Sequence, residues 1–208
     1  MGGVGNRENL HSIQPARGDR YGGDRIRMGS TAEAVAEEYA IDRAAQDEYA
    51  LRSHRRATRA TDEGRFGTEI VPVETGTEVV TGDEGIRRDT SLDALADLAP
   101  VFADEGTVTA GNASQVSDGA AGVAVTSRAL AADRGLAVLA EVGAHAVAGV
   151  DPTVMGIGPV PAVRRLCART GRDPGDYDLV ELNEAFASQC LYCKRKLGFD
   201  DAVYNVNG

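Results

Sequence analysis

The sequence contains no tryptophan, and aromatic residues of all kinds make up only 5% of its 208 residues. A core built mainly on aromatic rings is therefore excluded, although a hydrophobic content of 42% is enough for a buried core. Glycine, alanine and valine dominate instead, so the core must form where small-residue helices and strands approach each other closely. This composition is typical of a layered α/β protein.

Positive charge is also scarce. Lysine occurs only at Lys194 and Lys196, and the formal net charge of the chain is -10. Such a chain repels nucleic-acid phosphates and anionic membrane surfaces, so we expect neither as a partner. No run approaches the roughly 20 apolar residues of a membrane span, and no signal peptide follows Met1. The sequence therefore predicts a cytoplasmic protein.

Cysteine occurs at Cys167, Cys190 and Cys193 alone, which is too few and too clustered for a disulfide framework. The Cys-x-x-Cys pair could be redox partners or half of a zinc site, but the sequence has no second pair. We expect core or interface thiols and no metal. The histidines lack partners at a recognisable spacing, and His54 lies in an arginine-rich helix face that we expect to be solvated surface.

Hydrophobic patterns and turn residues predict alternating helices and strands. Ser30 and Glu33 resemble a capping box for a first helix, and a second helix should run from about Asp42 to Glu63, where Gly64 ends it. Because strands and helices alternate after residue 120, we expect a largely parallel sheet covered by helices. The expected strands are 68–74, 78–81, 120–126, 137–147, 177–182 and one beginning at 203; the later helices are 92–98, 127–134, 161–169 and 184–197.

A loop crowded with small polar residues, TVTAGNASQVSDG, spans residues 107–119. Its glycines would let a ligand lie against the backbone, and its serine hydroxyls could orient amide groups. A tight turn with hydrogen bonds from side chains to the backbone explains the same residues without a ligand. The pattern alone leaves both interpretations open.

A second polar motif, Asn183 and Glu184, follows the apolar segment 179–182. An asparagine between a strand and a helix is a favoured N-cap, which would explain Asn183 structurally. The same position also puts an amide and a carboxylate at the carboxyl edge of a parallel sheet, where α/β proteins bind ligands. A third motif, MGIGPVP at 155–161, has neither dinucleotide-binding nor P-loop spacing, and we expect it to pack on a pocket.

In their order along the chain, these motifs resemble the thiolase family. Several independent motifs in the same order cover nearly the whole chain from Met28. They are MGSTAEAVAEEYAIDRAAQDEYALRSHRRA (28–57), GRFGTEIVPV (64–73), TVTAGNASQVSDGAA (107–121), VAGVDPTVMGIGPVPAVRRL (147–166), DLVELNEAFASQ (178–189) and NVNG (205–208).

The resemblance implies an α/β chain with a thiolase-like layered αβαβα fold, incomplete at both ends. Residues 1–131 would be the remainder of the N-terminal domain with the loop region that covers coenzyme A, and 132–208 the first part of the C-terminal domain. The implied reaction converts 3-ketoacyl-CoA and CoA into acyl-CoA and acetyl-CoA, or runs in reverse as a condensation. CoA and acyl-CoA are then substrates, no cofactor is expected, and the full-length form would be a homo-oligomer.

The same resemblance assigns residues to the site. Asn183 would hold the water of an oxyanion hole and Glu184 would orient a histidine, which makes these two the expected catalytic residues. Ser114 would hydrogen-bond the pantetheine arm, and Arg87 would lie near the adenine and phosphate end. Ala94 departs from relatives that offer a serine to CoA. The residues expected to line the CoA and acyl tunnel are Phe102, Ala110, Met28, Met155, Ala185 and Phe186.

Thiolases use a nucleophilic cysteine, a histidine that activates it and a second cysteine that moves a proton. None of the three cysteines here matches these positions, and the histidine motif would follow Gly208. We therefore expect an inactive fragment of an acetyl-CoA acyltransferase, and FASQCLYCKRKLG at 186–198 favours fatty-acid β-oxidation. The alternative is a non-catalytic acyl-CoA-binding or interaction protein that keeps the pantetheine groove.

Overall fold

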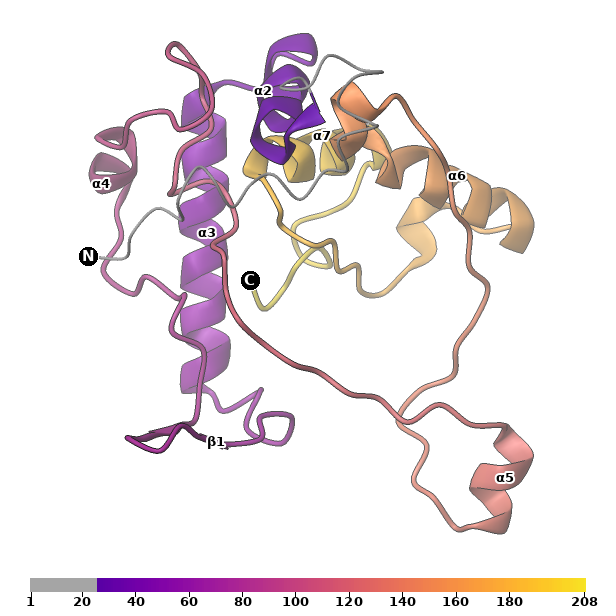
Figure 1. Ribbon diagram of the computed structural model, residues 1–208. Helices are drawn as coiled ribbons and strands as arrows, with labels where there is room; N and C mark the ends of the chain where they lie inside the picture. Colours follow the sequence, from indigo (N-terminus) through magenta and orange to yellow (C-terminus); the bar gives the residue numbers. More distant parts are fainter. Residues whose placement is uncertain (1–25) are drawn as a thin grey trace.

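The computed structural model describes residues 26–208, so the predicted loop over residues 1–27 lies almost wholly outside the described part (Figure 1). Helices dominate, and long extended segments connect them. In chain order the elements are α2 (Met28–Glu38), α3 (Arg43–Asp62), β1 (Val73–Glu74), β2 (Val79–Val80), α4 (Leu92–Ala96), α5 (Arg128–Asp133), η3 (Pro152–Ile157), α6 (Pro159–Thr170), η4 (Pro174–Asp176) and α7 (Ala187–Leu197).

The two long N-terminal helices begin differently. α3 begins as predicted, because the carboxylate of its N-cap, Asp42, accepts a hydrogen bond from the Ala45 N–H at 2.8 Å. α2 begins two residues before Ser30 and has no side-chain cap, so the predicted capping box of Ser30 and Glu33 is wrong. The Glu33 carboxylate turns instead to the polar loop at 107–119. A distant contact has replaced the local one.

Serine caps begin the two short helices. The Ser91 hydroxyl accepts a hydrogen bond from the Ala94 N–H at 3.1 Å and so caps α4. Ser127 caps α5 in the same way, through the Leu130 N–H at 3.2 Å. Figure 1 shows α5 at the far end of two extended stretches, apart from the other helices.

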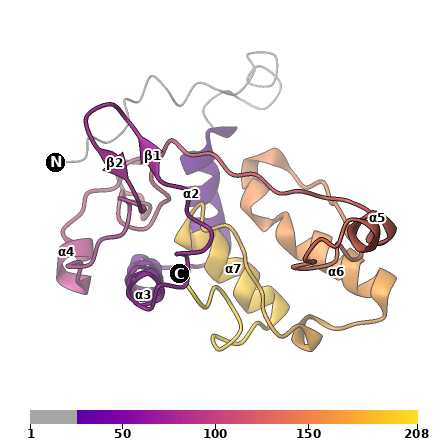
Figure 2. The same cartoon turned by 90° about the horizontal axis from the view of Figure 1, so that it is seen from below.

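α7 lies between α3 and α6 in both views (Figures 1 and 2) and contacts α2, α3, α6 and η3. Cys190 and Cys193 are completely buried there, which agrees with their prediction as core side chains. The helix ends at Gly198, whose φ of 71° provides a left-handed C-cap. The main core cluster around α7 consists of Val35, Ile41, Tyr49, Val160, Ala187, Cys190, Tyr192, Cys193, Leu197, Phe199 and Tyr204.

The predicted parallel sheet is not formed among residues 26–208. The sheet in this part of the chain is the antiparallel pair β1–β2, with two residues in each strand. Segments 120–126 and 137–147 run without strand pairing, and Leu139 is 98% exposed. The prediction of strands there is wrong for the described chain, because a strand needs backbone hydrogen bonds to a neighbouring strand and these segments pair with no other segment among residues 26–208.

One piece of the predicted parallel pairing does appear, beside the second polar motif. Val180 forms a single parallel bridge with Tyr204, in place of the predicted strands 177–182 and 203 onward. The Val180 N–H donates to the Val203 carbonyl at 2.8 Å, and the Asn205 N–H donates back to the Val180 carbonyl at 2.9 Å. This pairing holds the segment that ends at Asn183 next to the last residues of the chain.

Candidate functional site

A cavity of about 460 Å³ opens between α3 and the two polar motifs, and we name it the α3 cavity. Ser114 from loop 107–119, together with Asn183 and Glu184 from the segment before α7, lines it. Three of the predicted site residues therefore share one space, although the two motifs are far apart in the sequence. The α3 residues on its wall are Tyr49, Ala50, Ser53, His54 and Ala57.

Backbone pairing holds the two polar motifs side by side. The Ser114 N–H donates to the Ala185 carbonyl at 2.9 Å. Ala113 and Phe186 form an antiparallel bridge at the same place. The main chain, rather than side-chain packing, therefore sets the position of Ser114 relative to Asn183.

Asn183 does not cap a helix. α7 begins at Ala187 with Phe186 as its N-cap, so the purely structural explanation of Asn183 and the predicted helix start at 184 are both wrong. The pairing of 112–114 with 185–187 keeps this segment out of the helix. The Asn183 side chain is exposed at the α3 cavity and makes no hydrogen bond to residues 26–208. Its amide is free to meet a ligand or a water molecule.

Glu184, by contrast, is held on both oxygens. Its Oε1 accepts hydrogen bonds from the Tyr49 hydroxyl at 2.7 Å and from Asn205 Nδ2 at 2.8 Å. Its Oε2 accepts one from the Ser53 hydroxyl. Burial is the main cause that raises the pKa of Tyr49 far above its ordinary value, so this hydroxyl keeps its proton and remains a donor. The carboxylate therefore has one fixed orientation at the cavity wall.

The three residues that hold Glu184 were not among the predicted site residues. Tyr49 and Ser53 are four residues apart on α3 and so lie on the same helix face, a spacing that many helices share. Asn205 was noted only as part of the NVNG stretch. Its side chain also donates to the Leu182 carbonyl and accepts from the Leu182 N–H, both at 2.8 Å. Asn205 therefore takes the place of a missing strand partner for this segment.

The first half of loop 107–119 is organised by buried side chains. Asn112 is 3% exposed, accepts from the Thr109 N–H at 2.8 Å and donates to Asp47 Oδ1 at 3.0 Å. The Glu33 carboxylate accepts from the N–H groups of Thr107 and Val108. These hydrogen bonds form the tight turn that was one of the two interpretations of this loop. They do not involve Ser114, which is exposed at the cavity.

His54 lies at the α3 cavity, not on freely solvated surface, so that prediction is wrong. Its Nδ1 accepts a hydrogen bond from the Arg87 N–H at 3.2 Å, which brings the loop of Arg87 against α3. Burial lowers the pKa of His54, the charge of Arg87 lowers it further, and Glu184 opposes both. Arg87 itself is not on the cavity wall, although its neighbours Gly85 and Ile86 are.

Two predicted aromatic residues lie together beyond the cavity wall. The rings of Phe102 and Phe186 meet edge to face, with centroids 6.1 Å apart and planes at 83°. A Cβ on Gly29 would lie 2.1 Å from the Phe102 ring, so the backbone of α2 approaches this ring closely one residue after Met28. The structure thus brings Phe102 and Phe186 together beside the Ser114 pairing.

The remaining predicted residues are less directly placed. Met155 lies in η3, which packs against α2, and it is outside the wall of the α3 cavity. Ala110 and Ala185 also lie outside the wall and directly adjoin two lining residues, Gly111 and Glu184. The structure therefore brings Ser114, Asn183 and Glu184 together at the α3 cavity, while the other predicted residues lie outside its wall.

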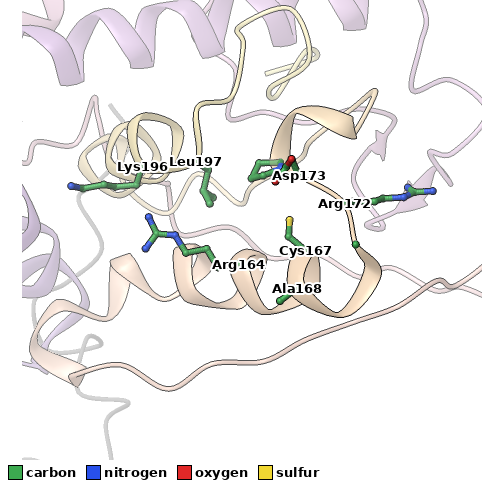
Figure 3. Close-up of a pocket in the computed structure, with 9 residues that line it drawn as sticks. Arg164, Cys167, Ala168, Arg172, Asp173, Lys196 and Leu197 are labelled. Atoms are coloured by element: carbon green, nitrogen blue, oxygen red, sulfur yellow. The ribbon is translucent and has the colours of Figure 1, made fainter.

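A second cleft, of about 490 Å³, lies between α6, the turn after it and the end of α7 (Figure 3). Cys167 lines this cleft, and two of the basic side chains that line it each lie near an aromatic ring. The Arg172 guanidinium lies 5.7 Å from the Tyr177 ring centroid, and Lys196 Nζ lies 5.9 Å from that of Tyr192. Figure 3 shows these two cations pointing to opposite sides, so they do not converge on one ligand position.

Within residues 26–208, no group of three or more histidine, cysteine, aspartate or glutamate side chains is arranged to hold a metal ion. None of the helices described there combines the length and the apolar character needed to cross a membrane.

Comparison with known families gives two matches in chain order. The family model for the thiolase N-terminal domain matches residues 18–129, and the model for the thiolase C-terminal domain matches residues 136–208. An acetyl-CoA acetyltransferase of Paracoccus denitrificans is 49% identical over 185 residues, which cover 87% of this chain and 47% of the relative. A 3-ketoacyl-CoA thiolase of Bacillus subtilis is 49% identical over 194 residues, which cover 87% of this chain and 50% of the relative.

Solved structures agree with these sequence matches. The acetyl-CoA acetyltransferase of Bacillus anthracis superimposes with a TM-score of 0.83 at 44% identity, over 88% of this chain and 47% of that one. The human mitochondrial 3-ketoacyl-CoA thiolase in complex with CoA gives 0.81 at 42% identity, over 88% and 46%. The chain spans about half the length of the relatives that it matches. It has part of their layered α/β fold and belongs to the thiolase family.

Proposed function

We propose that this chain supplies the acyl-CoA-binding part of a thiolase-type acyltransferase, which converts 3-ketoacyl-CoA and CoA into acyl-CoA and acetyl-CoA or runs the reverse condensation. The observation that carries the proposal is the α3 cavity, where Ser114, Asn183 and Glu184 lie on one wall. The names of the relatives, acetyl-CoA acetyltransferase and 3-ketoacyl-CoA thiolase, support the substrate class. The motif at 186–198 favours a role in fatty-acid β-oxidation.

Glu184 is proposed to position a catalytic histidine contributed by other thiolase polypeptide. A carboxylate offers about four lone-pair sites, and the protein uses three of them, through Tyr49, Ser53 and Asn205. One site remains for a donor that approaches from the cavity. Because the other three bonds fix the carboxylate, an imidazole N–H bound there would have a defined direction and tautomer.

Asn183 and Ser114 are proposed to contact the ligand or its water. The free Asn183 amide can hold the water molecule that donates to a thioester oxygen as negative charge develops on it. The Ser114 hydroxyl donates to its neighbouring carbonyl, that of Gln115, at 3.3 Å, a long bond that it can exchange for one to a pantetheine amide. The apolar pair Phe102 and Phe186 is proposed to border the acyl tunnel beside them.

The thiol nucleophile of this reaction is proposed to come from polypeptide outside this sequence. Burial raises the pKa of Cys190 and of Cys193 to about 12, and neither thiol is exposed. Cys167 faces the second cleft, away from Ser114 and Asn183. The attacking species is the thiolate, so none of these three cysteines suits the chemistry at the α3 cavity.

A second candidate function, a non-catalytic acyl-CoA-binding protein, is favoured by that same absence of cysteine from the cavity wall within residues 26–208. Genomic sequence on both sides of the coding region separates the two. In-frame segments that encode the nucleophilic cysteine and a Gly-His-Pro motif support the acyltransferase. Stop codons on both sides, with a ribosome-binding site before Met1, support the binding protein.

Calorimetric titration of the 208-residue chain with CoA tests the proposal directly. We expect saturable binding that weakens about three- to tenfold in Ser114→Ala, the effect of one lost neutral hydrogen bond. Ser117→Ala is the matched control, because Ser117 lies in the same loop, is exposed and does not line the cavity. Equal affinities for the two variants, or no binding by the wild-type chain, would contradict the proposed site.

A further inference from the structure

His54 has a defined hydrogen-bonding direction at the α3 cavity. It follows Ser53 on α3, on the wall that also carries Tyr49. Its Nδ1 accepts the Arg87 N–H at 3.2 Å, so this nitrogen carries no proton. The neutral imidazole must then carry its proton on Nε2, which is left as a donor. This tautomer follows from the backbone contact alone.

The surroundings of His54 favour the neutral ring. Burial and the nearby Arg87 charge both lower its pKa, and the Glu184 carboxylate opposes them without outweighing them. Glu181, whose pKa is itself raised, first by burial and then by Glu184, lies on the same cavity wall. A neutral His54 keeps its hydrogen bond to the loop of Arg87 and offers one N–H to the cavity.

His54 shares the α3 cavity with residues that the resemblance assigns to both ends of CoA. The loop of Gly85 and Ile86 lines the cavity and leads to Arg87, which the resemblance assigns to the nucleotide end and whose N–H binds His54. Ser114 and Asn183, assigned to the pantetheine arm and the thioester, line the same cavity. The ligand segment between those ends is the pantetheine chain, whose amides carry carbonyl oxygens that accept hydrogen bonds.

We propose that His54 is a further CoA-binding residue, which donates its Nε2–H to an amide carbonyl oxygen of the pantetheine arm. This assignment rests on the proposed function, because it takes the α3 cavity as the CoA site. It differs from a purely structural role, in which His54 would serve only to anchor the loop of Arg87 through Nδ1. The two roles use different ring nitrogens, and substitutions can separate them.

His54→Asn and His54→Gln separate the two nitrogens. An asparagine oxygen lies near the position of Nδ1 and can still accept the Arg87 N–H, but its amide does not reach the position of Nε2. A glutamine amide nitrogen reaches the position of Nε2 but does not supply the acceptor at Nδ1. We expect His54→Asn to weaken CoA binding about three- to tenfold and His54→Gln to bind nearly as wild type does.

The titrations use two probes, CoA and adenosine 3′,5′-bisphosphate, the second of which lacks the pantetheine arm. We expect both variants to bind the bisphosphate as the wild-type chain does. His145→Asn is the matched control for the same substitution, because His145 is exposed and outside the cavity. Thermal unfolding curves of each variant verify that the compared proteins are folded.

The outcomes separate the two hypotheses. Weaker CoA binding by His54→Gln than by His54→Asn, equal binding by both, or a parallel loss for the bisphosphate would overturn the donor role of His54 and leave the CoA site intact. Absence of CoA binding by the wild-type chain would overturn the proposed function and the assignment of His54 with it.

Discussion

Removal of the Tyr49 hydroxyl is expected to destabilise the chain measurably. Tyr49 is 4% exposed, and its hydroxyl donates to Glu184 Oε1 at 2.7 Å. A hydrogen bond to a charged acceptor contributes about 1.5–3 kcal/mol. Tyr49→Phe keeps the ring, and Oε1 keeps its bond from Asn205 Nδ2, so the lower end of this range applies. We expect a loss of about 1.5 kcal/mol, which corresponds to a fall in Tm of about 3–6 °C for a chain of this size.

Urea denaturation followed by circular dichroism measures this loss. Tyr177→Phe is the control, because the Tyr177 ring packs on Arg172 and its hydroxyl makes no hydrogen bond within residues 26–208. Its free energy of unfolding should change by less than about 0.5 kcal/mol. Equal changes in the free energy of unfolding for the two variants would show that the hydroxyl of Tyr49 does not hold Glu184 in solution. They would refute the claim that the Glu184 carboxylate has one fixed orientation.

Two further predictions follow from the thiols and from His54. In the folded chain an aromatic disulfide reagent should label Cys167 alone, because Cys167 lines the second cleft whereas Cys190 and Cys193 are completely buried and burial raises their pKa to about 12. After denaturation the reagent should label all three cysteines. Because neither buried thiol is available as a thiolate, the chain should not cleave acetoacetyl-CoA, and measurable turnover would contradict this. The pKa of His54 is lower in the folded chain than its ordinary value near 6.5, so the unfolded chain binds more protons and stability should rise with pH up to about 6.5. His54→Gln should flatten this rise in urea titrations between pH 5 and 7.5, and an unchanged slope would show that His54 is not the group responsible.

Helices could be predicted from the sequence wherever their ends depend on neighbouring residues. Asp42 caps α3, and Gly64, with a φ of 70°, follows its end as predicted. The strands predicted at 120–126 and 137–147 are not formed in the described chain, because the pattern of residues describes a segment but not its partner. The prediction at Ser30 failed for a similar reason, since Glu33 binds a loop that lies 74 residues away.

In the candidate site, too, contacts between residues distant in the sequence were harder to predict than the motifs themselves. The resemblance to the thiolase family assigned Ser114, Asn183 and Glu184 to the site, and the structure brings these three into one cavity. His54 was misjudged because arginine-rich neighbours indicate a solvated face, whereas the loop of Arg87 covers it from 33 residues away. Local sequence around His54 contains no trace of that contact.

The environment of Glu184 shows why residues that hold a site are harder to find than residues that form it. Its three donors are 135 and 131 residues earlier and 21 residues later in the chain. Tyr49 and Ser53 are ordinary helix residues, and only the packing of α3 against α7 turns them toward the carboxylate. A variant of either one should therefore change Glu184 without changing the helix that carries it, and a double-mutant cycle between Tyr49→Phe and Ser53→Ala should show coupling of about 0.5 kcal/mol or more.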